Sequence, residues 1–428
     1  MRLFFLFVLL TFPYNLSSLE VVELTTKKDI KLWFVKDDSL PIISINFSFN
    51  YGSFHENEQK SGTANLLASM LDESTANFNS KKFQEKMKSI GMKLRFTTSK
   101  NKFSGTFQTI SENVQESFEL LKMAINRETF DEDDVKKVKN QIKASLRFKQ
   151  SDISSISSRL FTESFYLGHK FSNPIEGNSE SIDRISSIDL LKFRDDFFVK
   201  SGLKIGVSGN ILQTELLKYI DYVFGDLELR SKKDVKIPKF EKLAIGKKYQ
   251  KKTSPQTAVV FGQKGLSRKD KNFFALRIVN YVLGGGGFQS RLYKKIREQN
   301  GLVYSIYSYL IPYNDDGVIL GGFQTKNESV NETINILKSE WNKIKTDGIT
   351  KSEFIEAKSY YLGSFSRNYT STRSIASLLN TIQFYELDIN YFQDRKMIIN
   401  NISHEEVNKI ARDIFDSEKL FFAIVGGS

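Results

Sequence analysis

LGGGGFQSRLYKKIREQNGLVYSIYS, residues 283–308, carries three local signals in one short segment. Its apolar residues Phe288, Leu292 and Ile296 recur at helical spacing, which predicts a helix with one apolar stripe. The Asn-Gly pair that follows is a typical helix stop, and residues 302–309 are predicted to form a strand. The four glycines match neither a P-loop nor a dinucleotide-binding fingerprint, because the residues that those motifs require are missing. They are interpreted as a flexible turn between helices.

The order of elements in this region also occurs in the first half of the chain. Each half begins with an alternating strand that leads into an apolar helix, and each half closes with a helix followed by a strand that ends in glycine. The matched segments are 41–53, 61–72, 186–198 and 203–211 in the first half, and 256–267, 271–283, 402–415 and 419–427 in the second. The sequence therefore predicts an internal duplication.

This duplication predicts the fold class and the domains. Each half mixes strands with long amphipathic helices, so the class is α+β, with two homologous halves that each pack a mixed β-sheet against α-helices. The first half is predicted over residues 19–228 and the second over 253–428. Residues 229–252 are polar and rich in lysine and contain Pro238, so they are interpreted as a linker.

The N-terminus predicts export. Arg2 is followed by an apolar run from Leu3 to Phe12 and then by small residues, of which Ser18 is the expected cleavage point. Such a run is too short to span a bilayer and is typical of a signal peptide, so residues 1–18 are predicted to direct the protein to the periplasm. The alternative is a buried first strand. No later segment has eighteen consecutive apolar residues, so no stable membrane span is expected.

Composition excludes several classes of function. The 428 residues are 40% apolar and 26% charged, as in an ordinary globular protein, and they include no cysteine. Disulfides, thiol nucleophiles, iron–sulfur clusters and cysteine-bound zinc are therefore excluded. The net charge of +12 is spread along the chain, with no basic stripe interleaved with aromatic residues, so no nucleic-acid partner is expected.

Two motifs together carry a resemblance to a known family. The first half contains GSFHENEQKSGTANLLASML at residues 52–71, with G-S-x-x-E from Gly52 and a motif helix that starts at Gly62. The second half contains L-G-G-G, S-R-L and R-E-x-x-G-L-x-Y within residues 283–304. This pattern resembles the pitrilysin or insulinase-type zinc peptidases, the inverzincins with an H-x-x-E-H motif. The resemblance covers nearly the whole chain after the signal segment, and implies two halves that face each other as a clamshell.

The resemblance also implies a lost zinc site. Asn65, Ala68 and Ser69 occupy the positions of His, Glu and His in H-x-x-E-H, and the third ligand, a glutamate, is expected near Val138. Zinc in proteins is held by thiolate, imidazole or carboxylate, so none of these residues is a suitable ligand. No metal and no other cofactor is expected in this chain. Its three histidines, which form no spaced ligand pair, are His55, His169 and His404.

Arg297 and Tyr304 match the other part of the family's site. The resemblance assigns this pair to gripping the substrate and stabilising the carbonyl oxygen of the scissile bond, for which a guanidinium and a phenol are suitable donors. Without the resemblance, Arg297 would be interpreted as a positive charge that offsets the partial negative charge at the C-terminus of its helix, and Tyr304 as a residue that packs in the sheet. With the surrounding match, a substrate-binding role is favoured.

These expectations lead to a hypothesis for function. The chain is interpreted as the catalytically incomplete, substrate-binding subunit of an exported zinc metallopeptidase, whose partner in a heterodimer is a homologous H-x-x-E-H subunit that holds the zinc. Its substrates would be peptides. The alternative is a peptidase-like peptide-binding or scaffold protein without a role in catalysis. An autonomous enzyme with another metal site is disfavoured, because too few ligands are present.

Overall fold

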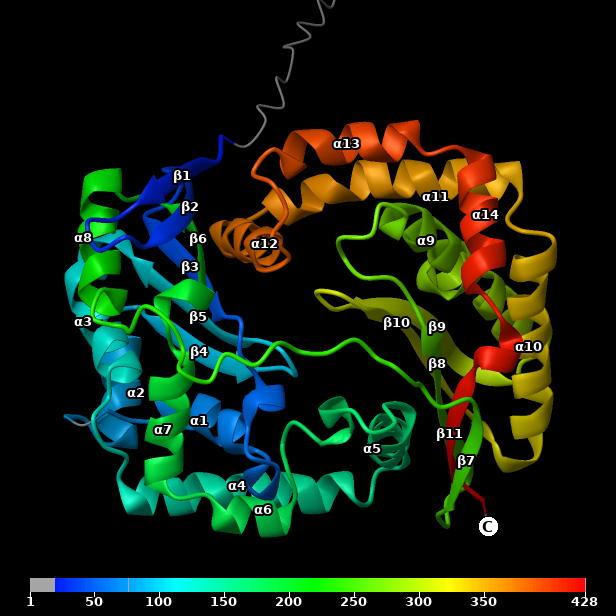
Figure 1. The fold of residues 1–428 in the computed structure, drawn as a ribbon, viewed down its shortest axis with the longest axis horizontal. Helices are drawn as coiled ribbons and strands as arrows, with labels where there is room; N and C mark the ends of the chain where they lie inside the picture. The colour runs from blue at the N-terminus through cyan, green and yellow to red at the C-terminus, as the bar shows by residue number, and fades with distance from the viewer. Residues whose placement is uncertain (1–19, 76, 428) are drawn as a thin grey trace, which may run out of the picture.

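The computed structural model describes residues 20–75 and 77–427. The predicted signal peptide, residues 1–18, lies outside these residues, and export therefore stays a prediction. Two halves lie side by side, each with one β-sheet and helices packed on it (Figure 1). The predicted α+β class with two matching halves is confirmed.

The first half is built on a six-stranded sheet of order β1-β2-β6-β3-β5-β4. Its strands are β1 (Val22–Thr25), β2 (Lys31–Lys36), β3 (Ile42–Phe49), β4 (Lys93–Thr98), β5 (Phe103–Ile110) and β6 (Leu203–Gly209). Its helices are α1 (Thr63–Leu71), α2 (Ser80–Ser89), α3 (Val114–Ile125), α4 (Glu132–Lys149), α5 (Ile153–Phe165), α6 (Ser179–Arg184), α7 (Ser187–Phe197) and α8 (Gln213–Phe224).

The second half is built on a five-stranded sheet of order β7-β11-β8-β10-β9. Its strands are β7 (Gly246–Lys251), β8 (Gln256–Lys264), β9 (Val303–Pro312), β10 (Gly317–Lys326) and β11 (Phe421–Gly426). Its helices are α9 (Phe273–Asn280), α10 (Val330–Thr346), α11 (Lys351–Gly363), α12 (Thr372–Phe384), α13 (Tyr391–Asn401) and α14 (His404–Ile414).

The pairing of the strands follows the duplication. In the first sheet β6 pairs parallel with β2 and antiparallel with β3, and in the second β11 pairs parallel with β7 and antiparallel with β8. The order β2-β6-β3-β5-β4 thus corresponds strand by strand to β7-β11-β8-β10-β9, and β1 is an addition to the first half.

Strand β7 lies within residues 229–252, which the sequence predicted as a linker. All six residues of β7 are exposed and three of them are lysines, so the strand has no apolar alternation that would reveal it. Lysine-rich sequence is typical of an edge strand that must not pair with other chains. The limits of the two domains stay a prediction.

Each half contributes one helix to the sheet of the other half. Helix α5 packs on β8 and β11 of the second sheet, and α12 packs on β3 and β6 of the first (Figure 1). Glycine allows both close approaches. A Cβ at Gly206 of β6 would lie 2.4 Å from the carbonyl oxygen of Ala376, and one at Gly262 of β8 would lie 2.8 Å from the ring of Phe161.

Two histidines hold the segment that connects the halves. The Nε2 of His55 lies 3.2 Å from the carbonyl oxygen of Val235, and the Nε2 of His169 lies 3.2 Å from that of Pro238. Burial lowers the pKa of both imidazoles, which keeps them neutral near pH 7. The two histidines of the first half therefore hold the connecting segment in place through its backbone carbonyl groups.

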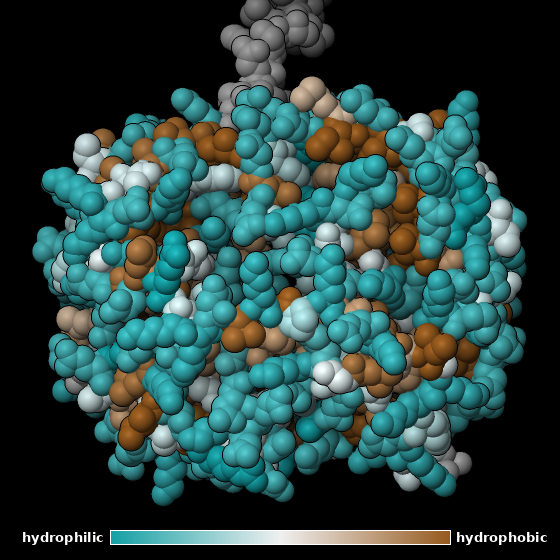
Figure 2. Space-filling model, viewed as in Figure 1, coloured by the Kyte–Doolittle hydropathy of each residue, from teal (hydrophilic) through white to brown (hydrophobic). Residues whose placement is uncertain are grey.

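One face of the molecule is largely hydrophilic. Hydrophilic residues cover most of the face shown in Figure 2, and apolar residues form separate patches. Within residues 20–75 and 77–427, no helix has the length and apolar character that crossing a bilayer requires.

Candidate functional site

The motif helix α1 is fixed at its start by a buried carboxyl group. The two oxygens of Glu56 accept hydrogen bonds from the backbone N–H groups of Gly62, at 2.8 Å, and Ala64, at 2.6 Å. Gly62 has a φ of 101°, a left-handed conformation that suits glycine. Burial raises the pKa of Glu56 to about 8, although the two hydrogen bonds act in the opposite direction. The glutamate of G-S-x-x-E thus serves as the helix cap, a role that the sequence analysis did not assign.

The three positions of the lost zinc motif share one face of α1. Asn65 and Ser69 are partly buried, and Ala68 between them is 3% exposed. The hydroxyl of Ser69 donates to the carbonyl oxygen of Asn65, 3.0 Å away, so the backbone of the helix already uses it. The structure thus brings these positions together, but with an amide, a methyl and a hydroxyl in place of zinc ligands.

The position expected for the third ligand lies in apolar core. Val138, on α4, is 2% exposed and belongs to the same hydrophobic cluster as Leu67 and Leu71 of α1. Across residues 20–75 and 77–427, no group of three His, Cys, Asp or Glu side chains is placed to hold a metal ion. The residues present therefore do not fit a zinc ion.

The interpretation of the four glycines as a turn between helices holds only for the last two. Gly284 and Gly285 belong to a helical segment, while Gly286 and Gly287 connect it to the next one, and a Cβ at Gly287 would meet nothing within 4 Å. Helix α9 continues into a π-helical segment, Tyr281–Gly285, in which a Cβ at Gly284 would lie 2.4 Å from the hydroxyl of Ser308 on β9. The side chain of Asn280 donates to the carbonyl oxygen of Ser308 and accepts from its hydroxyl, at 3.1 and 2.8 Å. Strand β9 is thereby held against the end of α9.

Arg297 lies on a second π-helical segment, Tyr293–Gln299, just before β9. Such segments are rare and are often found at functional sites. The side chain of Arg297 is exposed, and its guanidinium lies 5.2 Å from the centre of the Tyr293 ring. Gly301, with a φ of 64°, donates its N–H to the carbonyl oxygen of Arg297 and makes the turn into the strand. The predicted stop at this glycine is confirmed.

Tyr304 lies in a bulge at the start of β9. Val303 opposes Thr325 of β10, whereas Ile306 opposes Phe323, so β9 has one residue more than its partner over this stretch. A bulge re-aims the side chains that it contains and is frequent at sheet edges next to active sites. The side chain of Tyr304 is 86% exposed, and it makes no hydrogen bond or ring contact with the residues that the structure describes.

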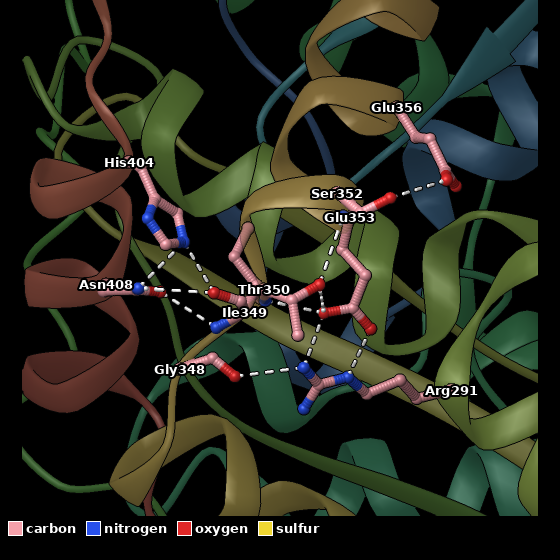
Figure 3. A network of polar contacts seen from close by, with 9 residues as sticks. All are labelled: Arg291, Gly348, Ile349, Thr350, Ser352, Glu353, Glu356, His404 and Asn408. Carbon is pink, nitrogen blue, oxygen red and sulfur yellow. Dashed lines mark hydrogen bonds and ion pairs between the residues drawn. The ribbon is translucent and has the colours of Figure 1, made fainter.

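Arg291 of the same motif has a structural role. Its guanidinium binds both carboxylate oxygens of Glu353, at 2.7 and 2.6 Å, and donates to the carbonyl oxygen of Gly348 at 3.1 Å (Figure 3). Nearby, the ring of His404 lies 2.6 Å from the carbonyl oxygen of Ile349. Arg291 lies just before the π-helical segment Tyr293–Gln299 and thus joins that segment to the first turn of α11. In the sequence, nothing about the arginine of S-R-L distinguishes this structural role from a role in ligand binding.

The arrangement supplies hydrogen-bond donors without a metal. Arg297 and Tyr304 belong to the second half, while α1 lies in the first half (Figure 1). The two exposed donors can bind a carbonyl oxygen, but α1 has no group that could activate water. This chain alone therefore presents an incomplete peptidase site.

The comparisons with known families agree with this geometry. The family described as "Insulinase (Peptidase family M16)" matches residues 34–179, and the one described as "Peptidase M16 inactive domain" matches residues 184–361. Together the two matches span most of the chain.

Two bacterial relatives match over nearly their full length. A Bacillus subtilis protein named "Uncharacterized zinc protease YmxG" is 27% identical, over 94% of this chain and 98% of that protein. A Helicobacter pylori protein named "Non-peptidase homolog YmxG" is 28% identical, over 96% of this chain and 94% of that protein.

Solved structures share the fold. A Pseudomonas fluorescens structure described as a peptidase M16 inactive domain aligns with a TM-score of 0.90 at 22% identity, covering 96% of this chain and 98% of that one. A Helicobacter pylori structure described as a protease aligns with a TM-score of 0.84 at 18% identity, covering 96% and 100%. The two matched regions, 34–179 and 184–361, both correspond to the M16 peptidase family. The chain therefore belongs to the insulinase-type M16 peptidases, as a member whose motif helix lacks the zinc ligands.

Proposed function

We propose that this protein is the substrate-binding subunit of a two-chain zinc peptidase, and that it is catalytically inactive alone. Its partner would be a homologous chain with an intact H-x-x-E-H motif. That chain would hold the zinc ion, which polarises the scissile carbonyl and activates water.

One observation carries this proposal. Tyr304 is 86% exposed on a bulge that directly follows the turn after Arg297. Burial of a tyrosine ring is favourable, so a residue that served only to pack the sheet would be expected to have a covered ring. An exposed phenol and an exposed guanidinium on the two sides of one turn are suited to a ligand from outside the chain.

The chemistry of the two chains would be complementary. The partner would supply metal and general base from its first half, and this chain would supply two donors from its second half. Donors aimed at the developing oxyanion stabilise the transition state of peptide hydrolysis. Neither half-site is sufficient without the other.

The experiment is a reconstitution. The mature chain, the H-x-x-E-H chain and an equimolar mixture are each assayed for peptide hydrolysis, and each is analysed for zinc. We expect no hydrolysis and no stoichiometric zinc in this chain alone, and we expect hydrolysis by a complex that contains one zinc per pair. One tightly held zinc per molecule of this chain, with hydrolysis in the absence of any partner, would refute the proposal.

A second candidate is a scaffold or peptide-binding protein. The Helicobacter pylori relative named "Non-peptidase homolog YmxG" favours it. A complex that assembles but whose hydrolysis does not depend on Arg297 and Tyr304 would be the result expected of a scaffold.

We also propose that the pair works outside the cytoplasm. This rests on the apolar run from Leu3 to Phe12. A reporter enzyme that is active only after export should be active when fused behind residues 1–20, and a reporter that stays cytoplasmic would refute export.

A further inference from the structure

Three arginines line one cavity of about 200 Å³ in the second half. Arg268 lies in the loop between β8 and α9, Arg277 on α9 and Arg395 on α13. The cavity is also lined by α12, the helix that packs on the first sheet (Figure 1). The residues that α12 contributes are Leu378, Thr381 and Ile382.

Among residues 20–75 and 77–427, no carboxylate forms an ion pair with these charges. In the part of the chain that the structure describes, none of the salt bridges involves the three arginines. Their hydrogen-bond acceptors are neutral: Arg268 donates to the hydroxyl of Tyr391 at 2.6 Å, and Arg395 to the carbonyl oxygen of Tyr361 at 2.8 Å. Arg277 lies over the ring of Tyr361, with 4.5 Å between the guanidinium carbon and the ring centre.

The cluster holds its charges at an energetic cost. Arg395 is only 4% exposed, and Arg268 is partly buried. Burial lowers the pKa of both guanidinium groups, and the like charge of Arg277 lowers it further. Rings offset part of this cost through cation–π contacts, but they carry no net negative charge. Buried charges in proteins are normally paired, so a negative partner is missing here.

We propose that this cavity binds a tetrahedral oxyanion, as inorganic phosphate or as the phosphoryl group of a small organic molecule. The planar fork of a guanidinium matches two phosphate oxygens, and three arginine side chains line this one cavity. A water in the liquid occupies roughly 30 Å³, so the cavity has room for the anion with several waters. The rings of Tyr385 and Tyr391, which also line the cavity, could contact an attached organic group.

The anion would fasten the joint between the two halves. On its other side α12 is bound to the first sheet, where Asn380 donates to the carbonyl oxygen of Lys204 and Gln383 to that of Ile205, both at 2.8 Å. A ligand held by Arg268, Arg277 and Arg395 would tie this helix to the body of the second half. This site is separate from Arg297 and Tyr304, and it does not depend on the proposed function.

The test is a binding measurement on the full mature chain. Inorganic phosphate and phenyl phosphate are each titrated by calorimetry, against sodium chloride at equal ionic strength. We expect saturable binding of at least one of them, and a melting temperature that rises with its concentration but not with chloride. Tighter binding of phosphate would identify the free ion, and tighter binding of phenyl phosphate an organic phosphoryl compound.

The matched variants are Arg277→Gln and Arg412→Gln. The side chain of Arg277, unlike those of Arg268 and Arg395, donates no hydrogen bond to the residues that the structure describes, and Arg412 is an exposed arginine on α14 outside the cavity. We expect Arg277→Gln to weaken binding at least tenfold and Arg412→Gln to leave it unchanged. If Arg277→Gln does not fold, Arg277→Lys keeps the charge without the bidentate fork and should also bind more weakly. Absence of saturable binding to either probe, or equal affinity of wild type and the Arg277 variant, would overturn the proposal.

Discussion

At the scale of single residues, each motif contains positions that hold the fold. Glu56 belongs to G-S-x-x-E and caps the motif helix, and Arg291 belongs to S-R-L and holds α11 through Glu353. Tyr304 has no such contact with the residues that the structure describes, and its side chain is exposed. The distinction decides which substitutions report on function and which report on stability.

The Arg291–Glu353 pair predicts a stability effect that depends on pH. Burial disfavours the ionised form of Glu353, but the hydrogen bonds and the charge of Arg291 outweigh it and lower the pKa of Glu353 below its ordinary value of 4.5. Stability from this pair is therefore present above about pH 4.5 and is lost as the pH falls through the lowered value. Arg291→Ala should lower the free energy of unfolding at pH 7 by about 2 kcal/mol, the usual range for hydrogen bonds to charged groups.

Urea unfolding at pH 7 and at pH 3 checks this prediction. The loss caused by Arg291→Ala should be smaller at pH 3 than at pH 7, because Glu353 in wild type takes up a proton as the pH falls through its lowered pKa. Arg412→Ala, the exposed control on α14, should show little loss at either pH. An equal loss from Arg291→Ala at both values would mean that the ion pair does not contribute as described.

At the scale of secondary-structure elements, the exchanged helices are the feature that joins the two halves. Helix α12 can approach β6 only because Gly206 has no side chain. Helix α5 approaches β8 in the same manner at Gly262. In both halves a helix is thus seated on a glycine of the opposite sheet, although the two glycines lie on strands that do not correspond to each other, β6 and β8.

Gly206→Ala should disturb this contact. The added Cβ would lie 2.4 Å from the carbonyl oxygen of Ala376 and 2.7 Å from the backbone nitrogen of Asn380, and neither backbone atom can move without α12. We expect a loss of about 1–3 kcal/mol in the free energy of unfolding, the usual cost of overpacking, with faster hydrogen exchange in α12. The control is Gly363→Ala, where the Cβ would meet nothing within 4 Å. Unchanged exchange rates in α12 would contradict this account of the joint.

The sequence predicted the elements well where their apolar pattern is strong. The alternation at residues 41–53 and 256–267 corresponds to β3 and β8, and the helical spacing at 61–72 corresponds to α1. The pattern could not reveal β7, whose residues are all exposed. Nor could it show that α5 and α12 exchange, because an apolar stripe predicts burial of a face without naming the sheet that covers it.

The candidate site was predictable in composition but not in geometry. The loss of zinc ligands at Asn65, Ala68 and Ser69 is legible in the residue types alone. The bulge that contains Tyr304 depends on the register between β9 and β10, which local sequence does not encode. Close packing of Gly284 on Ser308 is a tertiary contact, which a run of four glycines in the sequence does not reveal.

At the scale of the whole molecule, the two halves have diverged in what they offer. The first half keeps the motif helix without zinc ligands, and the second half keeps two exposed donors. In our proposal a second chain completes the site. The role of the donors can therefore be measured only in the assembled pair.

The most direct measurement is peptide turnover by the reconstituted pair with Tyr304→Phe, which removes one donor and keeps the ring. We predict unchanged assembly and a turnover that falls about a hundred- to a thousand-fold, the usual effect of losing an oxyanion donor. Arg297→Ala should also lower turnover, while Lys294→Ala, an exposed cation on the same helix, should not. Turnover by the Tyr304→Phe pair equal to that of wild type would contradict the substrate-binding role.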